Sequence, residues 1–331
     1  MKKASSKRQK IKFLLTKIFS SSLIDSLRNL LSIRHKFFYS RRLKNKVLKL
    51  IDAHHGEISS NLDLLKELHN EFETIDLKNN YKFESLLTSS RQRFNYLKEK
   101  KIGLKGKKVA DFGAGHGDSL FLCKELGFSR AVGLDFSDKD FIPHQEDLDE
   151  DVFSFIDFRT LDLVKDPLGI KDFDLITSFS AFEHFDDPKA VLDKCYESLA
   201  KGGHLYTEFA AFNSPYATHR KKFSGVPHIQ NIFNEEVSFN FFYDYLKINN
   251  KINRYTGEKI LDGNPYPEVN RYLIEDYEKI FLDKNRWEVI EYTKIKNYQY
   301  HWFIDCFRES FKDKNKDFLY VDYLKFLIKK K

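Results

Sequence analysis

A glycine-rich segment behind an acid is the part of the sequence best suited to chemistry. In DFGAGHG, Gly113, Gly115 and Gly117 alternate behind Asp111, which lies near the end of an apolar run. Glycine adopts positive φ readily and lets a ligand approach the backbone. A helix that we expect to begin at about Asp118 would present unpaired N–H groups at its start. The spacing therefore predicts a loop that binds a ligand through its backbone.

The carboxylates around this loop narrow the kind of ligand. Asp135 closes the next apolar run, at the separation of about 20 residues at which a carboxylate can accept hydrogen bonds from both ribose hydroxyls. The glycine spacing is G-x-G-x-G rather than the G-x-G-x-x-G of dinucleotide sites, and Asp118 at a helix start would repel a diphosphate. The pattern favours a nucleoside that carries positive charge, as S-adenosylmethionine does.

Strands and helices are expected to alternate around these residues. The apolar runs predict strands over 108–112, 130–135, 158–161, 173–179, 204–209 and 287–294, and helices over 118–126, 188–200 and 274–283. Further helices are expected within 61–101, and the tail from Tyr298 fits either a helix or a last strand over 318–328. Such alternation is typical of an α/β fold, a mostly parallel sheet with helices on both faces.

Four segments in order resemble the motifs of class I S-adenosylmethionine-dependent methyltransferases, in particular the ubiquinone-biosynthesis-like group. They are VADFGAGHG, GLDFS, TLDL and FDLITSFSAFEHFDDP, and LAKGGHLYTEF resembles the helix and strand that follow them. The resemblance covers about 108–209 and implies a Rossmann-like, seven-stranded sheet and S-adenosylmethionine as the cofactor. Two departures are His116 within the glycine loop and the lack of a clear seventh strand.

The resemblance also implies roles for particular positions. The expected cofactor-binding residues are Asp111, Gly113, Ala114, Gly115, Gly117, Asp135, Phe136, Asp162, Leu163, Ser178 and Phe179. The glycine loop would line the methionine part, Asp135 would bind the ribose, and the segment after the fourth strand would pass the sulfonium. Asp162 fits a contact to the adenine amino group as well as it fits a helix cap or a surface turn.

Three histidines are candidates for catalysis. His184 follows the fourth predicted strand, and His219 and His228 lie in the aromatic-rich insertion 213–269. An imidazole titrates near neutral pH, so it could remove a proton from an attacking oxygen or nitrogen. The insertion is expected to form a substrate lid, with His219 or His228 facing the acceptor. The alternative is that His184 is structural and that the insertion is an aromatic mini-core with solvated charges.

The missing motifs restrict the acceptor. A [DNS]-P-P-[YF] turn after the fourth strand, expected for methylation of an exocyclic nitrogen of DNA, is absent, as is a Pro-Cys nucleophile. No carboxylate cluster suggests a metal, so no metal is expected and a catechol-type enzyme is disfavoured. The expected acceptor is an oxygen or nitrogen of a small-molecule, sugar or lipid-linked compound. A binding protein that keeps the fold without turnover remains an alternative.

Charge and composition suggest three parts and a cytoplasmic protein. From Met1 to Ile51, Asp25 is the only acid among fifteen Lys and Arg, which predicts a basic amphipathic helical arm over 1–60. The arm could meet a membrane surface or another anionic partner, with RNA less favoured.

The cofactor domain would comprise 61–212 and 270–331, and the insertion 213–269. The three cysteines stand far apart without metal-site spacing, and no run of about 18 apolar residues is present.

Overall fold

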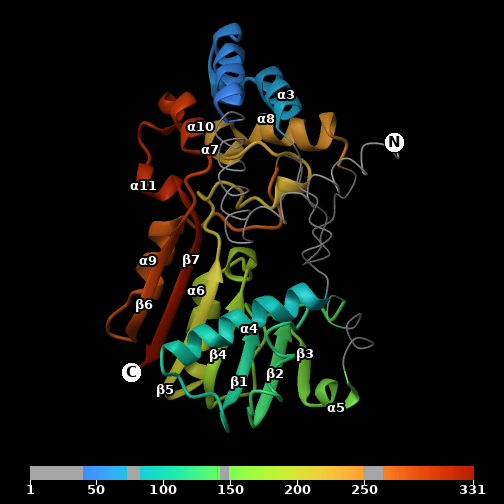
Figure 1. Ribbon diagram of the computed structural model, residues 1–331, viewed down its shortest axis with the longest axis vertical. Helices are drawn as coiled ribbons and strands as arrows, with labels where there is room; N and C mark the ends of the chain where they lie inside the picture. The colour runs from blue at the N-terminus through green and yellow to red at the C-terminus, as the bar shows by residue number, and fades with distance from the viewer. Residues whose placement is uncertain (1–39, 73–82, 140, 142–148, 249–263) are drawn as a thin grey trace, which may run out of the picture. The chain divides into compact units, whose positions relative to one another are not determined.

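The apolar runs of the sequence form one seven-stranded sheet in the described part of the chain (Figure 1). The computed structural model describes residues 40–72, 83–139, 141, 149–248 and 264–331. The strand order is β3-β2-β1-β4-β5-β7-β6, with β1 to β5 parallel and β7 antiparallel to both β5 and β6. The strands are β1 (Lys108–Phe112), β2 (Arg130–Asp135), β3 (Ile156–Thr160), β4 (Phe173–Phe179), β5 (Leu199–Phe209), β6 (Trp287–Lys296) and β7 (Val321–Lys330).

Helices cover both faces of this sheet, because successive strand residues are buried on opposite sides. On one face, Val109 of β1 packs in a cluster with Phe94 and Leu97 of α4 (Phe83–Glu99). On the other, Ala110 shares a cluster with side chains of α6 (Pro188–Ser198) and α9 (Ile274–Phe281). The α/β fold with a seven-stranded, Rossmann-like sheet is therefore confirmed, including the seventh strand that the sequence left open.

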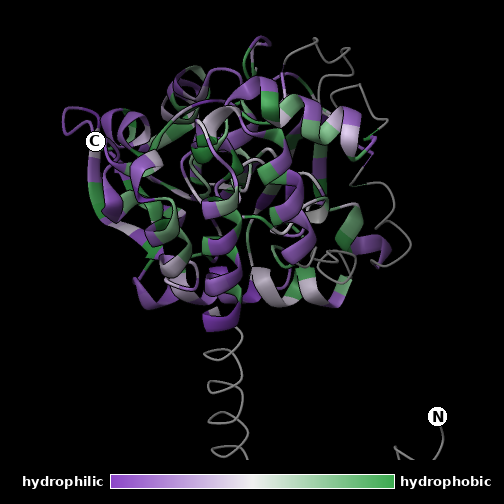
Figure 2. Ribbon diagram, turned by 90° about the horizontal axis from the view of Figure 1, so that it is seen from above, coloured by the Kyte–Doolittle hydropathy of each residue, from purple (hydrophilic) through white to green (hydrophobic). Residues whose placement is uncertain are grey.

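Local sequence signals explain where the flanking helices begin. The Asp187 side chain accepts the Ala190 N–H at 3.0 Å and Pro188 occupies the first turn, so α6 starts there. Asn61 caps α3 (Leu62–Glu71) by accepting the Leu64 N–H at 2.8 Å. Hydrophilic and hydrophobic residues alternate along the helices in Figure 2, as expected for elements that cover a core on one side.

The helix predicted over 118–126 is wrong. This segment consists of successive turns, with Leu120 N–H bonded to the Gly117 carbonyl and Cys123 N–H to the Leu120 carbonyl. The carbonyl of Asp118, which would accept the first hydrogen bond of a helix, instead accepts the Ser90 hydroxyl of α4 at 2.6 Å. Side-chain groups thus compete with the backbone ladder, which the local sequence does not reveal.

The tail combines both of the expected structures. The short helices α10 (His301–Cys306) and α11 (Lys316–Leu319) and the 3-10 turn η6 (Arg308–Phe311) precede strand β7. Three further short helices lie outside the tail and outside the insertion: η1 (Ile58–Ser60), α5 (Glu150–Phe153) and η3 (Phe182–His184).

The insertion after β5 packs around aromatic side chains. Its described elements are η4 (Arg220–Lys222), α7 (Ile229–Ile232), α8 (Glu235–Phe239) and the π-helical η5 (Asn240–Tyr245). Phe241, Phe242 and Tyr266 are fully or almost fully buried, and the Arg220 guanidinium donates to the Tyr243 hydroxyl at 3.1 Å. The insertion belongs to the same compact unit as the sheet.

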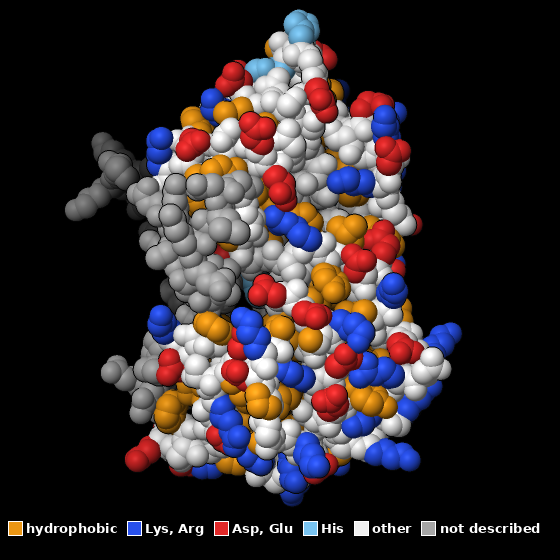
Figure 3. Space-filling view, turned by 180° about the vertical axis from the view of Figure 1, so that it is seen from behind, with side chains coloured by type: hydrophobic (Ala, Val, Ile, Leu, Met, Phe, Trp, Pro, Cys, Tyr) orange, Lys and Arg blue, Asp and Glu red, His pale blue; other side chains and the backbone are white. Residues whose placement is uncertain are grey.

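Two compact units divide the chain, 1–55 and 56–331. Within the first, a helix covers 40–53, while 1–39 of the predicted basic arm lie outside the described residues. None of the helices in the described ranges is long and apolar enough to cross a membrane. Over the part of the surface that surrounds the sheet in Figure 3, acidic and basic side chains are interspersed.

Candidate active site

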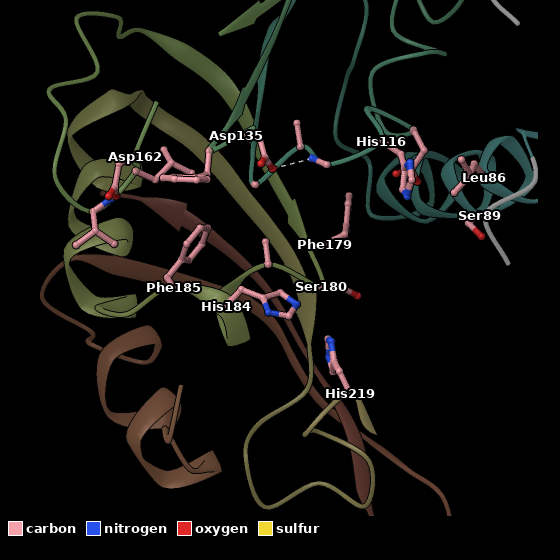
Figure 4. A pocket seen from close by; sticks show the side chains of 18 of the residues that line it. Leu86, Ser89, His116, Asp135, Asp162, Phe179, Ser180, His184, Phe185 and His219 are labelled. Atoms are coloured by element: carbon pink, nitrogen blue, oxygen red, sulfur yellow. Dashed lines mark hydrogen bonds between the residues drawn. The ribbon is translucent and has the colours of Figure 1, made fainter. Parts of the chain in front are cut away.

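A cavity of about 770 Å³ opens where the parallel strands end. This volume is within the range of pockets that bury small organic ligands. The close-up in Figure 4 shows Asp135 and Asp162 on one side of the cavity and Leu86 and Ser89 on the other, with His184 and His219 between them. The side chains and backbone that line it are Ser85, Leu86, Ser89, Arg93, Gly113, Ala114, Gly115, His116, Asp118, Asp135, Phe136, Asp162, Leu163, Val164, Lys165, Phe179, Ser180, Ala181, His184, Phe185, Asp186, His219 and Tyr323.

The glycine loop forms one wall of this cavity. Gly113 has φ +75°, and a Cβ added to it would come within 2.4 Å of the Ala181 Cβ, so glycine is required where the two loops meet. At Gly115, with φ +48°, an added Cβ would meet no atom within 4 Å. Gly115 therefore leaves open space on the cavity side, where a ligand can approach the backbone.

Asp135 is held by the same loop. One of its carboxylate oxygens accepts the Gly115 N–H at 2.8 Å and the other accepts the Ser137 N–H at 3.1 Å. The side chain is half-buried at the end of β2, and Phe136 beside it is 44% exposed. A fixed carboxylate next to an accessible aromatic ring offers hydrogen-bond acceptors and an apolar surface to the same ligand.

Asp162 stabilises a turn, which was one of its two predicted roles, and it also lines the cavity. Its Oδ1 accepts the Val164 N–H at 2.8 Å and the Lys165 N–H at 3.2 Å, so it stabilises the turn after β3. Burial raises the pKa of Asp162, but these hydrogen bonds and the Lys165 ammonium outweigh burial and lower the pKa overall. The residue also lines the cavity, together with the buried Leu163.

Four of the predicted site residues do not line the cavity. Gly117 turns the chain beneath the loop with its N–H bonded to the Ala114 carbonyl, and the buried Ser178 hydroxyl donates to the Phe112 carbonyl at 2.7 Å. His228 is fully buried in the insertion, with Nδ1 3.0 Å from the Asn231 amide nitrogen. Burial and the nearby Lys314 lower the pKa of His228 to about 3, so it remains neutral. The fourth is Asp111.

Asp111 lies below the glycine loop rather than beside the cavity. It is 3% exposed, and its carboxylate accepts hydrogen bonds from the hydroxyls of Ser119 and Thr177, the latter at 2.8 Å. Burial raises the pKa of Asp111 to about 7 despite these hydrogen bonds. Its position connects β1, β4 and the segment after the loop, which is a structural role.

The charge at Asp118 also differs from the expectation. No helix begins there, and its carboxylate pairs with the Arg93 guanidinium of α4 at 3.1 Å. Arg93 in turn lies over the Phe179 ring, 3.9 Å from its centroid. The paired acid places a cation and an anion together at the cavity wall, so discrimination against a diphosphate cannot rest on Asp118 alone.

A second group of polar side chains meets beside the cavity. Glu183 and His184 belong to η3, and His219 comes from the insertion; one ligand atom of each lies within 4.8 Å of the others. His184 Nδ1 contacts the Glu268 carbonyl, and the His184 and His219 rings meet edge to face with centroids 4.6 Å apart. Figure 4 shows the two rings facing one another at the cavity.

Sequence reasoning missed the contributions of α4 and of Glu183. Ser85, Ser89 and Arg93 line the cavity from a helix that precedes the first strand, and no motif marks them. Glu183 stands next to the predicted His184, but its proximity to His219 is created by tertiary packing across 35 intervening residues. Only the adjacent acid and histidine after β4 signalled this group in the sequence.

The sheet and the loop define the class of the domain. Residues 110–205 match the family model described as "Methyltransferase domain". The strand order, with an antiparallel β7 between β5 and β6, and the glycine loop with Asp135 at the next strand end agree with that match. The chain carries a class I, S-adenosylmethionine-dependent methyltransferase domain, as the sequence motifs predicted.

Individual relatives are distant. The chain is 28% identical over 146 residues to the ubiquinone biosynthesis O-methyltransferase of Vibrio atlanticus, covering 41% of this chain and 56% of that protein. It is 28% identical over 128 residues to the enzyme of the same name from Marinobacter nauticus, covering 38% and 52%. The chain spans about half the length of these relatives. The structure of an S-adenosylmethionine-dependent methyltransferase from Mesorhizobium loti is 13% identical, with 72% and 97% coverage and a TM-score of 0.44.

Proposed function

We propose that this protein transfers a methyl group from S-adenosylmethionine to an oxygen or nitrogen of a small-molecule, sugar or lipid-linked acceptor. The observation that carries the proposal is one cavity with two walls of different chemistry. Gly115, Asp135 and Asp162 offer backbone and carboxylate acceptors on one wall, and His184 and His219 offer imidazoles on a second wall, between the first and the side of α4. A donor and an acceptor can therefore bind side by side.

The first wall suits the nucleoside part of the donor. Asp135 would accept hydrogen bonds from ribose hydroxyls with the oxygens that Gly115 and Ser137 already orient. Phe136 and Leu163 would provide apolar surface for the adenine ring, and Asp162, which lines the same cavity, would contact its amino group. The open space at Gly115 accommodates the methionine part.

When bound, S-adenosylmethionine supplies a methyl group on a positively charged sulfur. The protein contributes mainly alignment, which can lower the barrier by about 7 to 11 kcal/mol. A general base contributes less, typically about 100-fold to 10,000-fold in rate. His184 and His219 line the cavity and could act as a base there, whereas His228 is buried in the insertion and does not line the cavity. Phe179 and Ala181 add apolar side chains to the lining of the cavity.

Calorimetric titration with S-adenosylhomocysteine tests the donor site. Asp135→Ala should weaken binding by at least about 10-fold, because hydrogen bonds to a charged group are lost. Asp174→Ala is the matched control: Asp174 pairs with Lys107 at 2.8 Å, near the start of β4, and does not line the cavity. Absence of binding to the intact protein would refute the proposal, as would equal effects of the two substitutions.

A screen for methyl transfer separates the enzyme from a non-catalytic binding protein that keeps the fold. Labelled donor is supplied with fractionated metabolites, lipids and RNA, and label is followed into each fraction. Transfer into a small-molecule or lipid fraction supports the proposal. Bound S-adenosylhomocysteine without transfer to any fraction would favour the binding protein.

RNA methylation is a second candidate because of the charge distribution. Fifteen Lys and Arg within 1–51 form the kind of basic segment that binds a phosphate backbone. Label entering RNA in the same screen, and only when this segment is present, would favour the second candidate over the first.

A further inference from the structure

A buried carboxylate without a hydrogen-bond partner lies next to two histidines that line the cavity. The Glu183 side chain is 4% exposed, and neither of its oxygens has a hydrogen-bond partner in the described part of the structure. The nearest basic side chain within 4.0 Å among the described residues is His219, whose Nε2 lies 3.7 Å from Glu183 Oε1, beyond hydrogen-bond distance. An uncompensated buried carboxylate is costly, and such groups are normally paired or bound to a metal.

Of the two histidines beside it, His184 has the orienting contact that is typical of a metal ligand. The Glu268 carbonyl can only accept a hydrogen bond, so its contact with His184 Nδ1 requires the proton on Nδ1 and places the lone pair on Nε2. A backbone carbonyl on the remote ring nitrogen is the usual means by which proteins orient a metal-binding imidazole. His184 and His219 face one another with their ring centroids 4.6 Å apart.

His219 is positioned at some cost in backbone energy. It has φ +56° immediately before η4, a left-handed conformation that residues with a Cβ rarely adopt. Backbone strain of this kind is concentrated at functional sites. The insertion thus supplies a side chain that completes a group otherwise formed only by η3.

We propose that Glu183, His184 and His219 bind one divalent transition-metal ion. One ligand atom from each residue lies within 4.8 Å of the others, close enough for small side-chain movements to bring all three onto one ion. Two imidazoles and one carboxylate suit Zn²⁺, Mn²⁺ or Fe²⁺ better than Mg²⁺ or Ca²⁺, which prefer oxygen ligands. Three protein ligands leave at least one position open, and both histidines line the cavity.

The open position identifies the class of acceptor, and this step rests on the proposed function. A divalent ion lowers the pKa of an adjacent hydroxyl. The acceptor is therefore a compound whose nucleophile is a hydroxyl oxygen. Its proton passes to solvent, the new O–C bond forms as the C–S bond breaks, and the sulfur keeps the electron pair of that bond.

Metal binding is measured directly on the full chain after removal of metal with a chelator. Calorimetry with Zn²⁺ should give one site per chain, and Zn²⁺ should raise the Tm. Glu183→Gln and His219→Asn should each weaken Zn²⁺ binding by at least about 10-fold and abolish the shift in Tm. Asn is chosen at position 219 because it tolerates the left-handed conformation.

His228→Asn is the matched control. His228 lies in the same insertion, also precedes a short helix, and has φ +59°, but it does not line the cavity. This variant should bind Zn²⁺ as the native chain does. No stoichiometric Zn²⁺ binding to the native chain would overturn the inference, as would binding that His219→Asn leaves unchanged. If Glu183→Gln does not fold, His219→Asn still decides, since the His219 side chain is 32% exposed.

S-adenosylhomocysteine binding is measured on the same samples. All three variants should retain it, because the hydrogen bonds from the Gly115 and Ser137 N–H groups to Asp135 involve none of the substituted side chains. Loss of Zn²⁺ binding with retained S-adenosylhomocysteine binding in the two ligand variants supports the metal site. Failure of the native chain to bind Zn²⁺ while it still binds S-adenosylhomocysteine refutes the metal site and leaves the proposed function intact.

Discussion

At the residue scale, burial changes the protonation of Asp111. Its pKa is raised to about 7 because the carboxylate is removed from water, although Ser119 and Thr177 donate hydrogen bonds to it. The folded chain therefore binds a proton at Asp111 between about pH 4 and pH 7, where the unfolded chain does not. This group makes the free energy of unfolding fall as pH rises through that window.

Asp111→Asn should remove this pH dependence. An amide resembles the protonated acid, so at pH 5 the variant and the native chain should have similar free energies of unfolding. At pH 8 the native chain carries a buried charge, and the variant should be more stable by about 3 kcal/mol, which corresponds to the two pH units between pH 5 and the raised pKa. Urea denaturation at both pH values measures the difference. A variant that is equally destabilised at pH 5 and pH 8 would contradict the assignment.

At the element scale, the loop after β1 divides its glycines between packing and ligand access. Gly113→Ala should destabilise the fold by several kcal/mol, because a Cβ 2.4 Å from the Ala181 Cβ adds a clash to the strain of positive φ. Gly115→Ala should cost only about 1 to 2 kcal/mol in stability. It should nevertheless weaken S-adenosylhomocysteine binding, because its methyl group enters the cavity.

Gly106→Ala is the control for backbone strain alone. Gly106 has φ +76°, an added Cβ would meet nothing within 4 Å, and the residue does not line the cavity. Its substitution should cost about as much stability as Gly115→Ala and leave ligand binding unchanged. Urea denaturation and calorimetry on the three variants check this. Equal ligand affinity in the Gly106 and Gly115 variants would show that the loop does not face the donor.

Some helices and strands could be predicted from the local sequence, and others could not. Strands β1, β2 and β4 are short, mostly apolar segments, so their positions were predicted closely. Residues 118–126 have a helical pattern in the sequence. In the structure, however, the Ser90 hydroxyl of α4 donates a hydrogen bond to the Asp118 carbonyl. Likewise, the meeting of Glu183 with His219 depends on how the insertion folds back. Contacts between distant segments are not encoded in local periodicity.

At the scale of the whole molecule, charge separates the two units. Residues 1–55 contain fifteen Lys and Arg against two Asp, and the remainder of the chain is net acidic. The unit that holds the cavity therefore has no overall attraction for polyanions. An anionic partner would be recruited by the basic unit, while donor binding depends on residues of the other.

This division predicts that the full chain sediments with vesicles containing anionic lipid and that the chain 56–331 does not. The basic side chains with the interspersed Leu and Ile of the predicted amphipathic helices supply the attraction, so retention should fall as salt rises and be absent on neutral vesicles. S-adenosylhomocysteine binding by 56–331 confirms that the shortened chain is folded. Retention of 56–331 on the vesicles would contradict the prediction. Stronger salt-sensitive retention of the full chain on RNA than on vesicles would instead favour the nucleic-acid alternative.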